Sequence, residues 1–341
     1  METTIQDVMI HLAGNKAQDQ DLFLSEQPAQ LDEIMRTKLC AYFLGRFGHV
    51  YEQYHFSEQP QGNIIAQESE GLFNDPDSLI ERSRRIATHL YNCATHPRIK
   101  PGELYVTMFD GYIHEGIPVR AVGIFKTELK NGYFEVRRSN ISVSMEYREG
   151  IDINKFDKGC LILEPPDGEK PVVLIIDQQS RGDEAVYWKD HFLSLEQRRT
   201  NFSMTSLALQ ATKNFVTDYL EQETDLDKTE KIDLMNRSAS FFKDHDEFQR
   251  KNFEDEVLEA PALIQQYRRY EQERRERSEA VPDDSFRISA QAVKQQVRIF
   301  KSVLKLDRNF HVYIHGNREL IQRGTDPDGR KFYKIYFDEE S

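Results

Sequence analysis

Ten basic side chains near the carboxyl end of the sequence have the type and spacing that contact with nucleic-acid phosphates requires. Residues 286–335 hold 11 lysines and arginines against 4 aspartates and glutamates, a local charge of +7 in a chain whose net charge is −13. Such cations bind the DNA backbone by displacing its counterions, so we expect salt-sensitive contacts that depend little on base sequence. The alternative is that they only balance the acidic remainder of the chain, within one molecule or across a dimer. The ten residues are Lys294, Arg298, Lys301, Lys305, Arg308, Arg318, Arg323, Arg330, Lys331 and Lys334.

A different chemistry, metal-dependent cleavage of nucleic acid, is suggested by Asp110 together with Glu128 and Lys130. Some nucleases hold Mg²⁺ beside an attacking water with one acidic residue and a Glu-x-Lys motif. The carboxylates must then converge on neighbouring strands. Because Glu128 and Lys130 lead directly into an Asn-Gly turn signal, a solvated hairpin end is the simpler interpretation.

No other grouping of side chains predicts catalysis or a bound cofactor. The sequence has no glycine-rich phosphate loop, nucleophile elbow, HExxH motif or zinc-type grouping of Cys and His. His311 and His315 are four residues apart, but their surroundings favour a strand, along which about 13 Å would separate them. An acidic group near the expected lobe junction is better interpreted as solvated loop carboxylates: Asp152, Asp157, Asp177, Asp183 and Glu184. We therefore expect no catalytic residue, no metal site and no cofactor.

Three further features are interpreted as structural. In the arginine-rich run of residues 267–277, the arginines alternate with glutamates, which favours a solvated helix face held by ion pairs over a nucleic-acid patch. Trp188, the only tryptophan, is predicted to anchor packing between two lobes. Cys40, Cys93 and Cys160 form no CxxC pair, which predicts reduced thiols that act as small core residues.

The elements that must position these residues follow from the periodicity of apolar side chains. Intervals of three and four predict helices over residues 28–47 and 78–97, with a loop over residues 55–75 between them. From residue 103 to 178 the period changes to two, with turn signals between short runs, which predicts an antiparallel meander with both helices on one face. Within it, alternation with polar residues predicts a buried face formed by Ile141, Val143, Met145 and Tyr147.

Beyond residue 179 the pattern is first helical and then extended again. Helices are predicted over residues 202–220, 227–243 and 262–278, and strands over residues 298–306, 310–315 and 332–337. Because single cores stop growing near ~250 residues, a chain of 341 residues is expected to form two units. We predict an α+β fold. A domain over residues 1–179 holds the meander sheet and its helices, and a domain over residues 180–341 holds helices followed by a small, basic antiparallel sheet, with residues 180–183 as the hinge.

Composition and termini predict a cytoplasmic protein outside any membrane. Residues 1–14 lack the basic stretch and apolar run of a secretory signal, and no window approaches the ~18 uninterrupted apolar residues of a bilayer span. The net charge of −13 argues against nucleic-acid binding by the chain as a whole. DNA contact therefore depends on the basic carboxyl-terminal segment.

Four blocks of sequence, in their order and spacing, resemble the 37-kilodalton nucleoid-associated protein family of bacteria. They are DINKFDKGCLIL at residues 152–163, YWKDHFL at 187–193, TKNFVTDYL at 212–220 and KLDRNFHVYIHGNREL at 305–320. The resemblance covers most of the chain and implies association with the bacterial nucleoid, DNA binding and no established catalytic activity, with DNA topoisomerases as partners of some members. It carries over no functional residue. Better-known members have a denser basic stretch before the main helix, where this chain has only Arg198-Arg199, so the carboxyl-terminal segment remains the preferred DNA surface.

These observations lead to one hypothesis and two rivals. The leading hypothesis is a nucleoid-associated protein, cytoplasmic and homodimeric, that binds double-stranded DNA through phosphate contacts of the ten basic residues. DNA topoisomerase or other nucleoid proteins are expected partners. The first rival is a protein-interaction adaptor that is recruited to DNA machinery or defence systems without touching DNA. The second is a metal-dependent nuclease.

Overall fold

The chain folds into two compact units, Met1–Arg198 and Arg199–Ser341. The computed structural model describes residues 3–58, 62–155, 157–177, 186–220, 228–277, 279–296, 303–306, 310–313, 320–337 and 339. The sequence places the boundary after Gln179, whereas the contacts place it after Arg198, because the segment of residues 187–197 packs into the first unit. The expected hinge, residues 180–183, lies outside the described residues.

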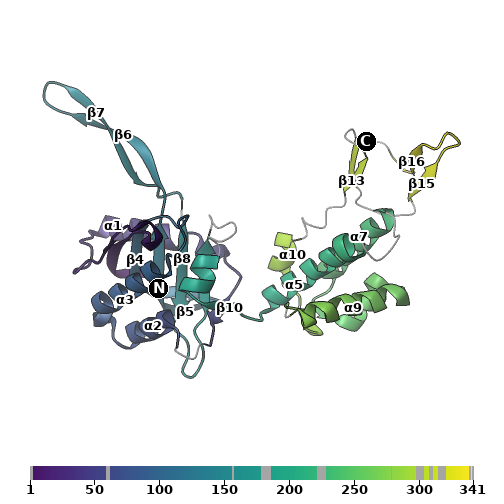
Figure 1. The fold of residues 1–341 in the computed structure, drawn as a ribbon, viewed down its shortest axis with the longest axis horizontal. Coiled ribbons are helices and arrows are strands. Elements are labelled where there is room, and N and C mark those ends of the chain that lie inside the picture. Colours follow the sequence, from purple (N-terminus) through teal and green to yellow (C-terminus); the bar gives the residue numbers. More distant parts are fainter. Residues whose placement is uncertain are drawn as a thin grey trace. The chain divides into compact units, whose positions relative to one another are not determined.

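An eight-stranded antiparallel sheet organises the first unit (Figure 1). Neighbouring strands follow the order β10-β3-β9-β8-β5-β4-β1-β2. The predicted meander is confirmed, because β4, β5, β8 and β9 pair in succession. The strands are β1 (Thr4–Ala13), β2 (Leu22–Phe23), β3 (Tyr54–Phe56), β4 (Gly102–His114), β5 (Ile117–Thr127), β8 (Lys158–Leu163), β9 (Val173–Asp177) and β10 (Leu195–Gln197).

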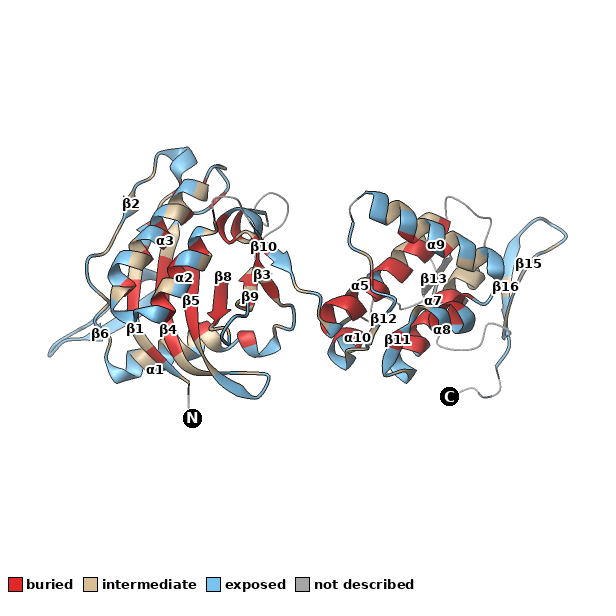
Figure 2. Ribbon diagram, turned by 90° about the horizontal axis from the view of Figure 1, so that it is seen from below, coloured by how far each residue is buried: buried red, intermediate tan, exposed pale blue. Residues whose placement is uncertain are grey.

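Helices cover both faces of this sheet, whereas the sequence analysis placed them on one face only (Figure 2). Alternate residues of β4 separate the two layers. Val106 lies on the face that packs against α2 (Ile64–Asn74) and α3 (Leu79–Cys93). Tyr105 lies on the opposite face, where α1 (Glu33–Leu44) packs. The centroid of its ring is 5.3 Å from that of Phe43 of α1. Because a long stretch of chain separates α1 from β4 and β5, on which it packs, local periodicity did not reveal which face it covers.

The segment of residues 55–75 was predicted as a loop, and this is wrong. It contains part of β3 and the whole of α2, which begins where the side chain of Asn63 accepts a hydrogen bond from the backbone N–H of Ala66 at 3.0 Å. Gly71, a turn signal in the sequence, lies inside the helix. A Cβ at this position would meet the guanidinium of Arg82, so the glycine leaves room for that side chain to lie over α2.

Trp188 belongs to the core of the first unit, so its predicted role as an anchor between lobes is wrong. It lies on a π-helical turn, η4 (Tyr187–Phe192), that packs beside α3. Its indole is fully buried, and its ring centroid lies 4.9 Å from that of Phe192.

The second unit is a helical bundle with an aromatic core. Its helical segments are α5 (Asn201–Asn214), η5 (Phe215–Tyr219), α7 (Lys228–Asp244), α8 (Arg250–Phe253), η6 (Glu254–Leu258), α9 (Pro261–Glu276) and α10 (Ala290–Gln296). Stacked and edge-on rings, among them Phe215, Phe248 and Tyr267, fill the space between the helices. A short strand pair, β11 (Glu247–Gln249) and β12 (Ser285–Arg287), closes one end. The helices predicted over residues 202–220, 227–243 and 262–278 are confirmed.

Two small antiparallel strand pairs follow the bundle in sequence, which confirms the predicted α+β fold class. They are β13 (Val303–Leu306) with β14 (Phe310–Tyr313), and β15 (Ile321–Thr325) with β16 (Lys331–Ile335). Within the described ranges, no helix is both long enough and apolar enough to cross a bilayer.

A long hairpin, formed by β6 (Lys130–Arg138) and β7 (Val143–Ile151), extends away from the sheet of the first unit (Figure 1). These strands pair with each other and with no other described strand. The prediction of a buried face here is wrong: the four apolar residues Ile141, Val143, Met145 and Tyr147 are 62–98% exposed. We refer to residues 130–151 as the β6–β7 arm.

Candidate nucleic-acid interface

The β15–β16 hairpin positions the best-defined part of the basic segment. Its tight turn is held by Asp326, whose carboxylate accepts hydrogen bonds from the backbone N–H groups of Asp328 and Arg330 at 3.0 and 2.8 Å. Gly329 has a φ of 80°, the left-handed conformation that such a turn requires. The turn therefore fixes the register in which Lys331 lies opposite Thr325.

Three cations of this hairpin, Arg330, Lys331 and Lys334, are exposed. None of them forms an ion pair with any other residue that the structure describes. The ammonium of Lys334 lies 4.7 Å from the centre of the Tyr336 ring, a cation–π contact that holds the side chain along the strand. The cations thus remain available to an anionic partner.

Aromatic side chains alternate with these cations. Phe332 and Tyr336 lie on the same face of the hairpin as Lys334, and the Phe332 ring covers Gly324 of the opposite strand. The hydroxyl of Tyr336 donates a hydrogen bond to the amide oxygen of Gln322 at 3.0 Å. The ammonium group of Lys334 suits a phosphate oxygen, and the exposed aromatic rings beside it suit nucleobases or sugars, so this face has the composition of a nucleic-acid contact.

The ten predicted cations are only partly described. Lys294 is exposed on α10 of the bundle, Lys305 belongs to β13, and Arg323 belongs to β15. The structure brings Arg330, Lys331 and Lys334 together on one hairpin, in register with the strand that carries Arg323. The other four, Arg298, Lys301, Arg308 and Arg318, lie outside the described residues.

The aromatic residues of this face are not among the contacts predicted from the sequence. The stretch of residues 331–337, KFYKIYF, alternates lysine with aromatic and aliphatic side chains. A search for cations interleaved with aromatic residues would have found it. It was instead interpreted only as a terminal strand with a positive charge.

In the other arginine-rich segment, residues 267–277, four of the five arginines form ion pairs within the second unit. On α9, Arg268 holds Glu254 at 2.5 Å, Arg269 holds Glu273 at 3.1 Å, and Arg274 holds Glu279 at 2.9 Å. The interpretation of residues 267–277 as an ion-paired helix face is therefore confirmed, and these arginines are not a nucleic-acid patch of the β15–β16 kind.

The residues of the suggested nuclease motif are not brought together. Asp110 pairs with Thr4 near one end of β4, whereas Glu103 at the other end of that strand pairs with Thr127, the neighbour of Glu128. Asp110 and Glu128 therefore lie far apart along the β4–β5 ladder, about 25 Å in the strand direction. Lys130 forms an ion pair with Glu103 at 2.8 Å instead of facing Asp110.

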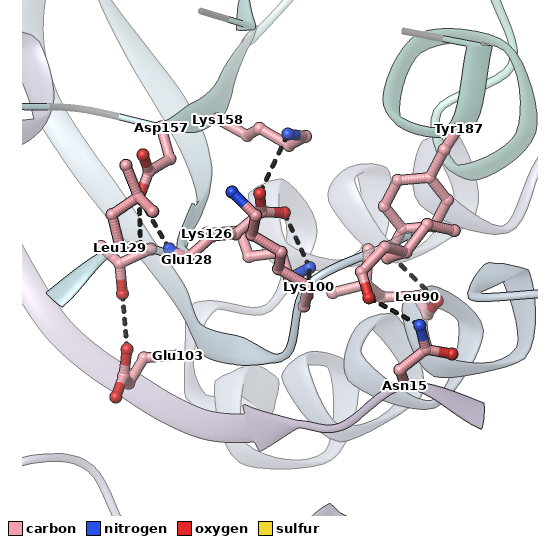
Figure 3. A network of polar contacts seen from close by, with 12 residues as sticks. Asn15, Leu90, Lys100, Glu103, Lys126, Glu128, Leu129, Asp157, Lys158 and Tyr187 are labelled. Atoms are coloured by element: carbon pink, nitrogen blue, oxygen red, sulfur yellow. Dashed lines mark hydrogen bonds and ion pairs between the residues drawn. The ribbon is translucent and has the colours of Figure 1, made fainter. Parts of the chain in front are cut away.

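Glu128 is instead the centre of a buried ion network (Figure 3). Its carboxylate accepts hydrogen bonds from the ammonium groups of Lys126 at 2.9 Å and Lys158 at 3.2 Å. Lys126 also donates to the carbonyl oxygen of Lys100 at 2.6 Å. Burial alone would raise the pKa of Glu128, but the two lysines hold it below its ordinary value. Asp157 completes the network, because its carboxylate accepts from the backbone N–H of Glu128 at 2.6 Å.

The suggested metal ligands are also dispersed. His311 lies on strand β14, as expected, and His315 is outside the described residues. Asp152 accepts a hydrogen bond from Asn131 at 2.8 Å, and Asp177 lies 3.5 Å from Lys158, while Asp183 and Glu184 are not described. In the described ranges, no three His, Cys, Asp or Glu residues are placed to hold one metal ion.

Comparison with known proteins gives one clear match. The family model described as nucleoid-associated protein YejK matches residues 9–340, which span both units and the β15–β16 hairpin. The resemblance expected from the four sequence blocks is thereby confirmed. No curated protein matches the sequence.

Proposed function

Because the chain belongs to the nucleoid-associated protein YejK family, which indicates a nucleoid-associated role, we propose that it binds double-stranded DNA by phosphate contacts that depend little on base sequence. The contact surface is the basic carboxyl-terminal segment of the ten cations, with the β15–β16 hairpin as its best-defined part. One observation carries the proposal. Arg330, Lys331 and Lys334 are exposed, and they form no ion pair among the residues described.

The acidic remainder of the chain limits how DNA can be held. Outside residues 286–335 the chain carries a charge of −20, which repels the phosphate backbone. Binding through a small basic surface then keeps the DNA away from the acidic surfaces. Such a surface supplies few contacts, so we expect weak affinity for each copy and a steep dependence on salt.

The proposal is tested by fluorescence anisotropy of the full-length protein with two duplexes of unrelated sequence, titrated from ~50 to ~300 mM salt. Neutralising three phosphates contributes about 2.7 to the slope of log K against log salt concentration. Replacing Arg330, Lys331 and Lys334 by Ala should therefore lower the slope by about that amount and weaken binding equally for both duplexes.

A matched control separates this surface from a general effect of charge. Replacing Lys16, Lys38 and Lys251 by Ala removes the same charge from exposed positions elsewhere, and it should change the slope little. If the wild-type protein does not bind either duplex in ~50 mM salt, the adaptor hypothesis replaces DNA binding. If both triple variants behave alike, the β15–β16 hairpin is the wrong surface.

A further inference from the structure

The β6–β7 arm separates apolar and charged side chains onto its two faces. Cross-strand pairs place Phe134 with Tyr147, and Val136 with Met145, on one face. These four side chains are 59–70% exposed, and the rings of Phe134 and Tyr147 meet edge to face with centroids 6.1 Å apart. The adjoining pair of Arg138 with Val143 extends the apolar row toward the tip. We call this the apolar face of the arm.

The opposite face of the arm carries charges that are already compensated. Arg137 holds Glu135 at 3.0 Å, and Arg148 bridges Glu135 and Glu146, with the second contact at 2.8 Å. Two arginines and two glutamates thus cancel each other, and this face offers no net charge to a nucleic acid. The arm therefore differs in chemistry from the β15–β16 hairpin.

The arm is anchored firmly where it leaves the sheet. Lys130 at its base pairs with Glu103 of β4 at 2.8 Å, and the amide of Asn131 donates a hydrogen bond to Asp152 at 2.8 Å. An isolated two-stranded hairpin is marginally stable in water, and its exposed apolar row is an association surface. An anchored arm with one bare apolar face is thus suited to packing against another apolar surface.

We propose that this surface is the apolar face of the arm of a second copy of the chain, packed face to face about a two-fold axis that sets the two arms antiparallel. The charges of the face determine this arrangement. Lys130, at the base of this face, is already paired with Glu103. Of the remaining charges, the cation Arg138 lies near the tip and the anion Glu149 near the base, and neither forms an ion pair within the described chain. When the two arms run antiparallel, Arg138 of each copy lies opposite the cross-strand pair that contains Glu149 of the other copy. When they run parallel, Arg138 would face Arg138 and Glu149 would face Glu149, so like charges would meet.

The apolar face of the arm is large enough to form a dimer interface. Strands of nine residues span about 30 Å, and the exposed apolar side chains offer on the order of 100 Å² each. Covering the five exposed apolar side chains of this face, Phe134, Val136, Val143, Met145 and Tyr147, on each copy removes roughly 1,000 Å² in total, the lower limit for a specific interface. The contact packs two sheets of two strands about 10 Å apart, as in the interior of a β-sandwich.

The first test is sedimentation equilibrium of the full-length protein. The wild type should be a dimer at micromolar concentration, and Met145→Glu, which puts a charge in the centre of the apolar face, should raise the dissociation constant at least ~100-fold. Ser144→Glu adds the same charge to the opposite face of the same strand and should leave the dimer intact. A monomeric wild type, or a dimer that survives Met145→Glu, overturns the proposal.

The second test addresses the antiparallel arrangement and does not depend on how well a core variant folds. Arg138→Glu and Glu149→Arg should each weaken the dimer several-fold, and the double variant should restore it, because the charges are exchanged between positions that face each other. If each single change weakens the dimer and the double variant weakens it further, the antiparallel contact is wrong. DNA binding is measured separately, so this outcome leaves the proposed function untouched.

Discussion

Lysines on β-strands have opposite surroundings in the two units. In the first unit, Lys126 on β5 and Lys158 on β8 are only 1% and 2% exposed, and both reach the carboxylate of Glu128. In the second unit, Lys331 and Lys334 on β16 are exposed and form no ion pair among the described residues. The residue type and the secondary structure are the same, and the position of the nearest carboxylate differs.

The comparison shows what decides the role of a cation in this protein. A buried ammonium group loses its hydration and requires a carboxylate beside it, so it becomes part of the structure. An exposed ammonium group without a carboxylate keeps its charge available to a partner. The β6–β7 arm is intermediate, because Arg137 and Arg148 are exposed but compensated by Glu135 and Glu146.

The largest effect is expected when the buried network loses its central carboxylate. Glu128→Gln leaves the buried ammonium groups of Lys126 and Lys158 with a neutral amide oxygen in place of the carboxylate, and breaking a buried ion pair from one side costs about 3–5 kcal/mol. Urea unfolding, followed by the fluorescence of Trp188 in the same core, measures the loss of unfolding free energy.

The matched control is Glu146→Gln, which removes an exposed partner of Arg148 in the arm. Surface ion pairs contribute about 0–1 kcal/mol, so this variant should unfold almost as the wild type does. Equal losses for the two variants would show that burial does not distinguish these ion pairs, and the comparison would fail.

His11 sharpens the comparison, because it is a buried group that can become a cation but forms no ion pair with a carboxylate among the described residues. Its Nδ1 accepts a hydrogen bond from the backbone N–H of Ser25 at 3.1 Å, and burial, with a contribution from Arg84, lowers its pKa to about 4. Between pH 6.5 and 4 the unfolded chain therefore binds a proton that the folded chain rejects. The unfolding free energy should fall by about 1.5 kcal/mol from pH 6.5 to pH 5, a window in which most carboxylates remain ionised.

Substitution identifies the group responsible. His11→Gln should flatten this part of the profile of stability against pH, while His49→Gln, at an exposed position, should leave it as in the wild type. A profile that keeps its slope in His11→Gln would assign the effect to another group.

Local patterns predicted the elements but not the contacts between distant elements. The two-residue period found β4, β5, β8 and β9, and the helical period found α3, α5 and α9, because each pattern is complete within its own segment. The same alternation could not show that the apolar row of the arm is exposed. Whether a strand is covered depends on partners far away in the sequence, and the next sheet strand after the arm, β8, pairs with β5 instead.

The sequence predicted the excess of positive charge in the candidate interface but not the arrangement of its side chains. Counting cations located the segment that contains Lys331 and Lys334, because an excess of charge is a property of composition. The structure was needed to show which cations lack an ion pair. Arginines are as dense on α9, but Arg268, Arg269 and Arg274 are paired there with Glu254, Glu273 and Glu279. The sequence contains the carboxylates in both cases, but only folding determines their distance from the cations.

The smallest expected effect comes from releasing the cations of the arm. Replacing Glu135 and Glu146 by Gln leaves Arg137 and Arg148 exposed without carboxylate partners, as Lys331 and Lys334 are. If carboxylate placement alone decides availability, this variant should gain DNA affinity a few-fold at ~50 mM salt, with a slope of log K against log salt steeper by about 1–2. Adding Arg137→Ala and Arg148→Ala should return both values to those of the wild type. If the DNA affinity measured by anisotropy titration does not rise, the cations also need aromatic neighbours such as Phe332 and Tyr336 on the β15–β16 hairpin. Charge compensation would then explain only part of the difference between the two regions.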